Sequence, residues 1–273
     1  MLSAISLSRA PQPTVRMQFA FMSNGTDHPD AYRQLSVSVI VPVYNEIELV
    51  ETSVQAIDGF LAGQELDHEI IIIESGSTDG SAAACDRLGE MLPAVAVIHE
   101  TQRNGLGSAL RLGYAAATMD LVWLVTVDIP FPLHTLCQAL PLIAECDCVL
   151  SYRSEDNRGA LRRIQSWGYN TLVKTVLGLP MRTVNSAFKL YRRSALTSIP
   201  LKSSGWFLDA EVLYWVARRG YRFREIPVPL LEREAGASKI GPSDIVWILR
   251  ELAKFRWSLM RDAPEPGHKG GTT

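Results

Sequence analysis

From residue 36 onward, short apolar runs alternate with stretches whose apolar residues recur at helical spacing. The apolar runs occupy residues 37–43, 69–73, 95–99, 121–127 and 148–151, and the helical patterns occupy 46–61, 106–117 and the segments after residues 79 and 132. This alternation is typical of a parallel sheet whose strands are joined by crossover helices. We therefore predict an α/β fold of the Rossmann-like type, with a mostly parallel sheet flanked by helices.

The alternation becomes less regular beyond Tyr152. The expected elements there are a basic helix at 158–176, a strand near 188–191, a helix at 209–219 and a strand near 223–229. We predict a disordered leader at 1–35, a single domain at 36–240, an amphipathic helix at 241–261 and a flexible tail at 262–273. The leader contains Arg9 and Arg16 but lacks the apolar core of a targeting segment.

Composition narrows the class of protein. A chain of 273 residues that is 47% hydrophobic can bury one large core, and a formal net charge of −2 provides no overall attraction to nucleic acid. No stretch reaches the roughly 18 uncharged apolar residues of a membrane-spanning helix. The four cysteines lack CxxC spacing and lie in apolar or helical stretches. They are expected to be buried thiols in a reducing compartment, which favours the cytoplasm.

Polar clusters follow three of the predicted strands. They are Tyr44-Asn45-Glu46, residues 74–80 and Thr126-Val127-Asp128. Asn45, with Glu48 three residues later, is expected to cap one helix, and Ser77 or Thr78 the next, which would leave exposed amide groups at the carboxyl edge. Ligands of open parallel sheets bind at that edge, so the three clusters are the candidate site.

These clusters carry a family resemblance. Residues 39–46, Ser77-Thr78-Asp79-Gly80 and Asp128 resemble, in order, three motifs of the inverting, nucleotide-sugar-dependent glycosyltransferases of family 2. The later segments 151–153, 188–193, 208–211 and 236–239 extend the resemblance to about three quarters of the chain. Within the family, the chain is most similar to the dolichyl-phosphate mannosyltransferase-like branch, whose members use polyprenyl phosphates.

The resemblance implies a GT-A-like fold and a site for a UDP- or GDP-sugar. A cation, Mg²⁺ or Mn²⁺, would be held by Asp128 against the diphosphate, in keeping with the preference of hard cations for oxygen ligands. The glycines of the 104–109 loop would let backbone amides approach the donor, although helix capping alone explains them equally well. The donor-binding residues implied are Pro42, Tyr44, Glu46, Glu74, Ser75, Asn104, Gly105, Asp128 and Lys239.

The chain departs from the family pattern in its acids. The family usually has two acids at the second strand end and Asp-x-Asp at the fourth, whereas this sequence has Glu74-Ser75 and Thr126-Val127-Asp128. The loss of two carboxylates would weaken cation binding. Asp128 and the donor phosphates would then hold the metal alone, or Lys239 and arginines would offset the charge. Taken alone, Asp128 and Glu74 are also ordinary residues for a strand end before a turn.

Basic residues after the fifth predicted strand are candidates for the acceptor site. Arg153, Arg162 and Arg163 can match phosphate oxygens with their planar forks. By resemblance, Arg153 and Arg163 would hold the acceptor phosphate. The alternative is an exposed basic helix face that forms surface salt bridges.

Two acids near the start of the 209–219 helix are further candidates. Asp209 and Glu211 lie two residues apart, so they would point to different faces of a helix and cannot both address one atom. Asp209 can cap the helix while Glu211 faces the cleft, where family members with hydroxyl acceptors place a general base. Together with Asp128 they form the predicted catalytic set. Lys239, in a Gly-Ala-Ser-Lys segment, either closes over the diphosphate or is a solvated lysine.

The last predicted helix has apolar residues at helical spacing, with Arg250, Lys254, Arg256 and Arg261 nearby and Trp247 and Trp257 beside them. Such a helix can lie in a membrane interface, pack on the sheet or form a homo-oligomer. Any membrane contact would be peripheral.

We therefore expect hexose transfer to a polyprenyl (dolichyl or undecaprenyl) phosphate at the cytoplasmic membrane face. One alternative is a soluble or cell-envelope hydroxyl acceptor, which requires Asp209 or Glu211 as base. Another is a non-catalytic, nucleotide-sugar-binding subunit. A nicotinamide-dependent oxidoreductase is disfavoured, because the first strand leads into residues 42–46 and not into a glycine fingerprint.

Overall fold

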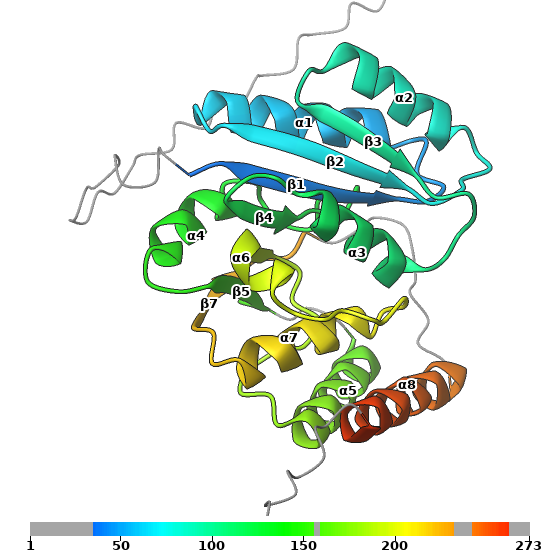
Figure 1. Cartoon of the computed structure of the whole chain (residues 1–273), viewed down its shortest axis with the longest axis vertical. Helices are drawn as coiled ribbons and strands as arrows, with labels where there is room; N and C mark the ends of the chain where they lie inside the picture. Colours follow the sequence, from blue (N-terminus) through cyan, green and yellow to red (C-terminus); the bar gives the residue numbers. More distant parts are fainter. Residues whose placement is uncertain (1–34, 156–158, 232–241, 262–273) are drawn as a thin grey trace, which may run out of the picture.

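A single seven-stranded sheet organises the chain. The computed structural model describes residues 35–155, 159–231 and 242–261 (Figure 1). The strands are β1 (Val37–Val43), β2 (His68–Glu74), β3 (Val95–His99), β4 (Leu121–Leu124), β5 (Cys148–Arg153), β6 (Lys189–Arg192) and β7 (Phe223–Val228). Their order is β3-β2-β1-β4-β6-β5-β7. Only β6 runs antiparallel to its neighbours among these strands, which confirms the mostly parallel sheet.

Helices cover both faces of the sheet. They are α1 (Val50–Gly63), α2 (Ser81–Met91), α3 (Leu106–Ala116), α4 (Thr135–Ile143), α5 (Ala160–Leu177), α6 (Arg193–Thr197), α7 (Leu208–Arg218) and α8 (Pro242–Arg261). Apolar residues of α1, α2 and α4 share one core cluster, and those of α3, α5, α7 and α8 share another. In β1, Val39 belongs to the first cluster and its neighbour Ile40 to the second. A strand buried on both faces reads as a continuous apolar run, which explains the sequence pattern.

Element positions agree with the expectation in most places. The strands at 37–43 and 95–99 occur as predicted, but β4 ends at Leu124 and not at residue 127. Beyond Leu124, the Val125 amide still donates to the Ile40 carbonyl, at 3.1 Å, and the Val127 carbonyl accepts from the Ser53 hydroxyl, at 2.5 Å. The chain therefore leaves the sheet ladder before it reaches Asp128. Helix α6 was not predicted.

The helix caps were predicted wrongly. Helix α1 begins four residues later than expected, and its N-cap, Leu49, makes no side-chain capping bond. Helix α2 has Gly80 at its N-cap, with a φ of 98°, in place of Ser77 or Thr78. The polar residues of these loops bond to each other across the sheet edge, as described below.

Strand order reverses at β1. Strands β2 and β3 lie on one side of it, and β4 lies on the other. The loops that leave the carboxyl ends of β1 and β4 therefore diverge, and this point is where open α/β sheets bind ligands. Tyr44 follows β1 and Asp128 follows β4. Strand β5 runs antiparallel to β6, which runs antiparallel to β4, so Arg153 at the end of β5 lies at the same edge.

Helix α8 packs against the start of α7. The ring of Phe255 lies 5.5 Å from that of Phe207 and 5.2 Å from that of Tyr214, between ring centroids. Leu252 is also buried in this cluster. This face of α8 therefore packs on the domain, while Arg250, Lys254 and Trp257 of the same helix are exposed.

Two further findings concern the whole described chain. None of the described helices combines the length and the apolar character that crossing a membrane would require. All four cysteines are free thiols, and Cys85, Cys146 and Cys148 are buried. Burial raises the pKa of the Cys85 thiol to about 12.

Candidate active site

The loops after β1 and β2 are bonded to each other through Asn45. Its backbone amide donates to the Ser77 hydroxyl at 3.0 Å, and its side-chain oxygen accepts from the Thr78 amide at 2.8 Å. Asn45 has a φ of 53°, a left-handed conformation that asparagine tolerates better than most residues. Asn45 thus joins two loops in place of capping a helix.

A second set of bonds completes the junction. The Ile47 amide donates to the Asp79 carboxylate at 3.1 Å, and the Glu46 amide donates to the Ser81 hydroxyl at 2.9 Å. The hydrogen bond from the Ser81 hydroxyl holds the pKa of Asp79 below its ordinary value. Backbone amides that the sequence predicts to be exposed at this edge therefore donate hydrogen bonds to side chains of the neighbouring loop.

Tyr44 provides an aromatic surface at the end of β1. It is half-buried, as are Pro42 and Glu46, and the Arg103 guanidinium lies 4.2 Å from its ring centroid. Gly76 has a φ of 69°, and a Cβ there would lie 3.0 Å from the Gln102 Cα. That close approach brings the 102–103 segment against the β2 loop. An aromatic ring with a planar cation stacked over it offers flat surfaces against which a base can stack.

Glu74 is buried and fully engaged. Its carboxylate accepts from the Ser77 amide at 2.6 Å and contacts His99 Nδ1 at 3.0 Å, and its exposed fraction is 2%. His99 Nε2 lies 2.8 Å from the Asp86 carboxylate. Desolvation opposes ionisation of Glu74, yet the bonds from His99 and Ser77 hold its pKa below the ordinary 4.5. Hydrogen bonds to Glu74 and then Asp86 raise the pKa of His99 above 6.5.

Ser75 bonds to a buried acid that the sequence analysis did not single out. The Glu100 carboxylate accepts from the Ser75 hydroxyl at 2.7 Å, from the Asn104 side chain at 3.1 Å and from the Ser108 hydroxyl at 2.7 Å. A buried carboxylate needs such donors to offset its lost hydration. Glu100 therefore holds the β2 loop, the β3 loop and the start of α3 together. Neither Glu100 nor Arg103 belongs to a motif from which its position in the site could be predicted, although both lie within five residues of Asn104.

The glycines before α3 accommodate another segment of the chain. A Cβ on Gly105 would lie 2.6 Å from the Ser204 carbonyl oxygen, and one on Gly107 would lie 2.6 Å from that of Gly205. The Ser108 amide donates to the Ser204 carbonyl at 3.0 Å. In this structure the glycines at 105 and 107 are explained by contact with the 204–205 backbone.

The two acids of α7 have separate partners. Asp209 forms a buried ion pair with Lys189 of β6, at 2.6 Å. The two oxygens of Glu211 accept from the backbone amides of Lys202 and Ser203, at 2.9 and 2.8 Å. The two carboxylates therefore point in different directions, as their two-residue spacing on a helix predicts. Asp209 does not cap the helix, because the N-cap is Phe207 and no side chain bonds there.

Asp128 is half-buried and lies in a strained turn. Ile129, directly after it, has a φ of 38°, and its amide donates to the Thr126 carbonyl at 2.9 Å. A β-branched residue with positive φ is a conformational outlier, and such strain is concentrated at functional sites. Phe131 anchors the far end of the turn, with its ring 5.4 Å from Phe188.

The donor set for a cation at this edge is small. Among residues 35–155, 159–231 and 242–261, no group of three or more His, Cys, Asp or Glu side chains could hold a metal ion. Asp128 supplies one carboxylate. Mg²⁺ is commonly held by one or two carboxylates together with substrate phosphates, so Asp128 fits a cation that arrives with a diphosphate.

The acceptor candidates lie on β5 and α5. Arg153 is exposed at the end of β5, and Arg163 is exposed in the first turn of α5. Nothing is described of the Arg162 side chain. Lys239 lies outside the described residues.

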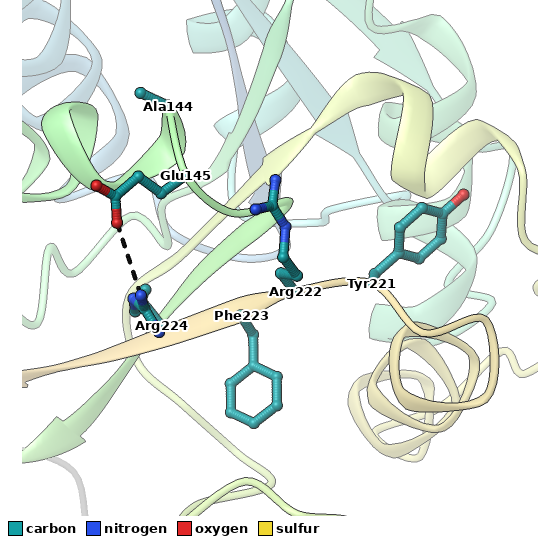
Figure 2. Close-up of a pocket in the computed structure, with 6 residues that line it drawn as sticks. All are labelled: Ala144, Glu145, Tyr221, Arg222, Phe223 and Arg224. Carbon is teal, nitrogen blue, oxygen red and sulfur yellow. Dashed lines mark ion pairs between the residues drawn. The ribbon is translucent and has the colours of Figure 1, made fainter.

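A hollow of about 530 Å³ lies away from this edge. Its lining residues are Ala144, Glu145, Tyr221, Arg222, Phe223 and Arg224 (Figure 2). Arg224 pairs with Glu145 at 3.6 Å, and both are largely exposed. The hollow borders the beginnings of β5 and β7, so it lies at the edge opposite to Asp128.

Comparison with known proteins identifies a family and sequence relatives. The family profile described as "Glycosyl transferase family 2" matches residues 38–199. The undecaprenyl-phosphate mannosyltransferase of Micrococcus luteus is 26% identical, over 83% of this chain and 98% of the relative. The dodecaprenyl-phosphate galacturonate synthase of Rhizobium johnstonii is 27% identical, over 91% of this chain and 73% of the relative.

A solved structure supports the fold. The glucosyl-3-phosphoglycerate synthase of Mycobacterium tuberculosis, in complex with Mn²⁺, UDP and glucosyl-3-phosphoglycerate, superposes with a TM-score of 0.62. The two sequences are 20% identical, and the superposition covers 91% of this chain and 88% of the other. The GT-A-like fold expected from the sequence is confirmed by this likeness.

The contact of α3 with the 204–205 backbone predicts a pair of opposite effects. Gly107→Ala should lower the free energy of unfolding by about 1–3 kcal/mol, because its Cβ would meet backbone atoms that cannot rotate away. Gly59→Ala, inside α1, should raise it by about 0.5–1 kcal/mol, because its Cβ has nothing within 4 Å. Urea unfolding measures both, and equal effects would contradict the contact.

The bonds of His99 predict a pH dependence of stability. Because the folded pKa of His99 lies above 6.5, its charged form contributes stability that is complete below pH 6.5 and is lost as pH rises through the folded value. Glu74 titrates in the opposite sense and below pH 4.5, outside this window. The thermal midpoint of the wild type should therefore exceed that of His99→Gln most at pH 6, and the gap should narrow towards pH 9. Parallel curves would show that the charge on His99 is unimportant.

Proposed function

The chain belongs to glycosyl transferase family 2, and from that membership we propose that it transfers a hexose from a UDP- or GDP-sugar to a polyprenyl phosphate, with inversion. The resemblance seen in the sequence is confirmed at the level of the family. Two relatives named for undecaprenyl and dodecaprenyl phosphate support the acceptor class. The proposal places the reaction at the cytoplasmic face of a membrane, with the protein attached peripherally.

The observation that carries the acceptor proposal is the position of Arg153. It lies at the same sheet edge as Asp128 and Tyr44, so a phosphate bound there would face the donor site. Guanidinium groups bind phosphate oxygens in pairs. Arg163, exposed on the next element of the chain, is the second proposed phosphate ligand.

The donor would lie across the ends of β1 and β2. We assign Pro42, Tyr44 and Glu46 to the nucleoside pocket, with the Tyr44 ring and Arg103 forming one wall. Glu74, Ser75, Asn104 and Gly105 would act mainly by holding the shape of that pocket, since each bonds to or packs against protein groups. Lys239, outside the described residues, is proposed as a cation that offsets the charge of the diphosphate.

The reaction needs no protein nucleophile. An oxygen of the acceptor phosphate attacks the anomeric carbon, the bond from that carbon to the diphosphate breaks, and the nucleoside diphosphate leaves with the bonding electrons. A divalent cation, Mg²⁺ or Mn²⁺, would neutralise the charge on the leaving diphosphate. Asp128 would hold it, and the strained turn at Ile129 would fix the direction of that carboxylate.

The transfer itself is the direct test. Labelled UDP-glucose, UDP-galactose, UDP-N-acetylglucosamine and GDP-mannose are incubated with undecaprenyl or dolichyl phosphate and Mg²⁺, Mn²⁺ or chelator. Label in the lipid phase supports the proposal and identifies the donor. Donor binding without lipid product would favour a hydroxyl acceptor or a non-catalytic subunit. In the active pair, Arg153→Ala should raise the acceptor KM about 10- to 100-fold, and Arg219→Ala, exposed at the end of α7, should leave it unchanged.

Glu211 distinguishes the phosphate acceptor from the hydroxyl acceptor. With a phosphate acceptor, Glu211→Gln should lower the free energy of unfolding by about 1–3 kcal/mol, because a buried amide loses its acceptor. The kcat of this variant should then decrease only through the loosening of the 202–203 loop, and not through the loss of a catalytic group. A loss of kcat of about 100-fold or more without loss of stability would identify Glu211 as a general base and favour a hydroxyl acceptor.

A further inference from the structure

Three tryptophans of the described chain are largely exposed. Trp167 on α5, Trp257 on α8 and Trp206 before α7 are 70%, 68% and 65% exposed. They are the exposed tryptophans among the residues whose side chains the structure describes. The contact of Phe207 with Phe255 ties the start of α7 to α8. Figure 1 draws α5 and α8 at the same end of the molecule.

Helices α5 and α8 also expose basic residues. The α5–α8 face is defined here by the exposed side chains Arg163, Ile164, Trp167, Leu249, Arg250, Lys254, Arg256, Trp257 and Arg261. Ile164 is 64% exposed and Leu249 is 46% exposed, so apolar and basic groups are interspersed. Glu251 is the acid of α8 whose side chain is described, and it is 20% exposed and paired with Lys254.

The charge of the chain is divided unevenly. Helices α5 and α8 contain seven basic and two acidic residues, a formal charge of +5. Because the whole chain carries −2, the remainder carries −7. A basic surface with exposed tryptophans complements the interface of an anionic bilayer, where indole rings lie at headgroup level and Lys and Arg are attracted to the lipid phosphates.

We propose that the α5–α8 face docks the protein on an anionic lipid surface. A second copy of the chain is a poorer occupant, because a two-fold interface would bring this basic face against itself. The role that we give to this docking rests on the proposed function. Because Arg163 and Ile164 are consecutive residues, a docked α5 would hold the proposed acceptor arginine at the depth of the lipid phosphates. Its physical test does not depend on catalysis.

Vesicle binding tests the docking. The full chain is sedimented with vesicles of phosphatidylcholine alone or mixed with phosphatidylglycerol, at low and high salt. We expect binding to the mixed vesicles that weakens with salt, and a loss of roughly tenfold or more in Trp167→Ala/Trp257→Ala. The matched control is Met91→Ala/Leu112→Ala on α2 and α3, which removes exposed apolar side chains elsewhere and should bind as the wild type does.

The outcomes separate docking from catalysis. Unchanged vesicle binding in the double tryptophan variant would overturn the proposal, and so would equal, salt-independent binding to phosphatidylcholine. Dimerisation that disappears in the same variant would assign the face to a second copy. Transfer to a short-chain, water-soluble polyprenyl phosphate without vesicles should persist in the tryptophan variant. Failure of that transfer in the wild type would count against the proposed function and leave the vesicle result intact.

Discussion

Strands β1 and β4 are neighbours in the sheet, and the chain reverses its direction of sheet growth between them. Their loops must diverge, with β2 beside β1 on one side and β6 and then β5 beyond β4 on the other. This arrangement places three of the candidate site residues at one edge: Tyr44 by β1, Asp128 by β4, and Arg153 by β5 through two antiparallel pairings. The donor and acceptor assignments both depend on one topological feature, not on any single motif.

Buried acids in this fold mainly hold loops in place. Glu74, Glu100, Asp209 and Glu211 are each no more than 9% exposed, and each carboxylate has protein donors. A carboxylate in a core would be costly without such partners, and the donors to Asp209 and Glu211 offset the cost of burying these two catalytic candidates. Asp128 differs in being half-buried beside a strained residue.

The sheet could be predicted because strands buried on both faces, such as β1 and β2, leave uninterrupted apolar runs. The helix caps could not be predicted, because Asn45 bonds to Thr78, 33 residues away, and the local sequence pattern does not indicate that bond. Glu100 and Arg103 were missed for the same reason: their partners come from other elements, and neither residue belongs to a pattern. The separation of Asp209 from Glu211 was predictable, since helical geometry alone determines it.

The contact between Gly107 and the Gly205 carbonyl has a consequence for how sequences of this kind diverge. Two segments almost a hundred residues apart touch backbone to backbone, so a side chain can enter at 105 or 107 only if the 204–205 segment retreats. Each segment therefore restricts the substitutions that the other can accept. A chimera that takes one of them from a relative must take the other from the same parent.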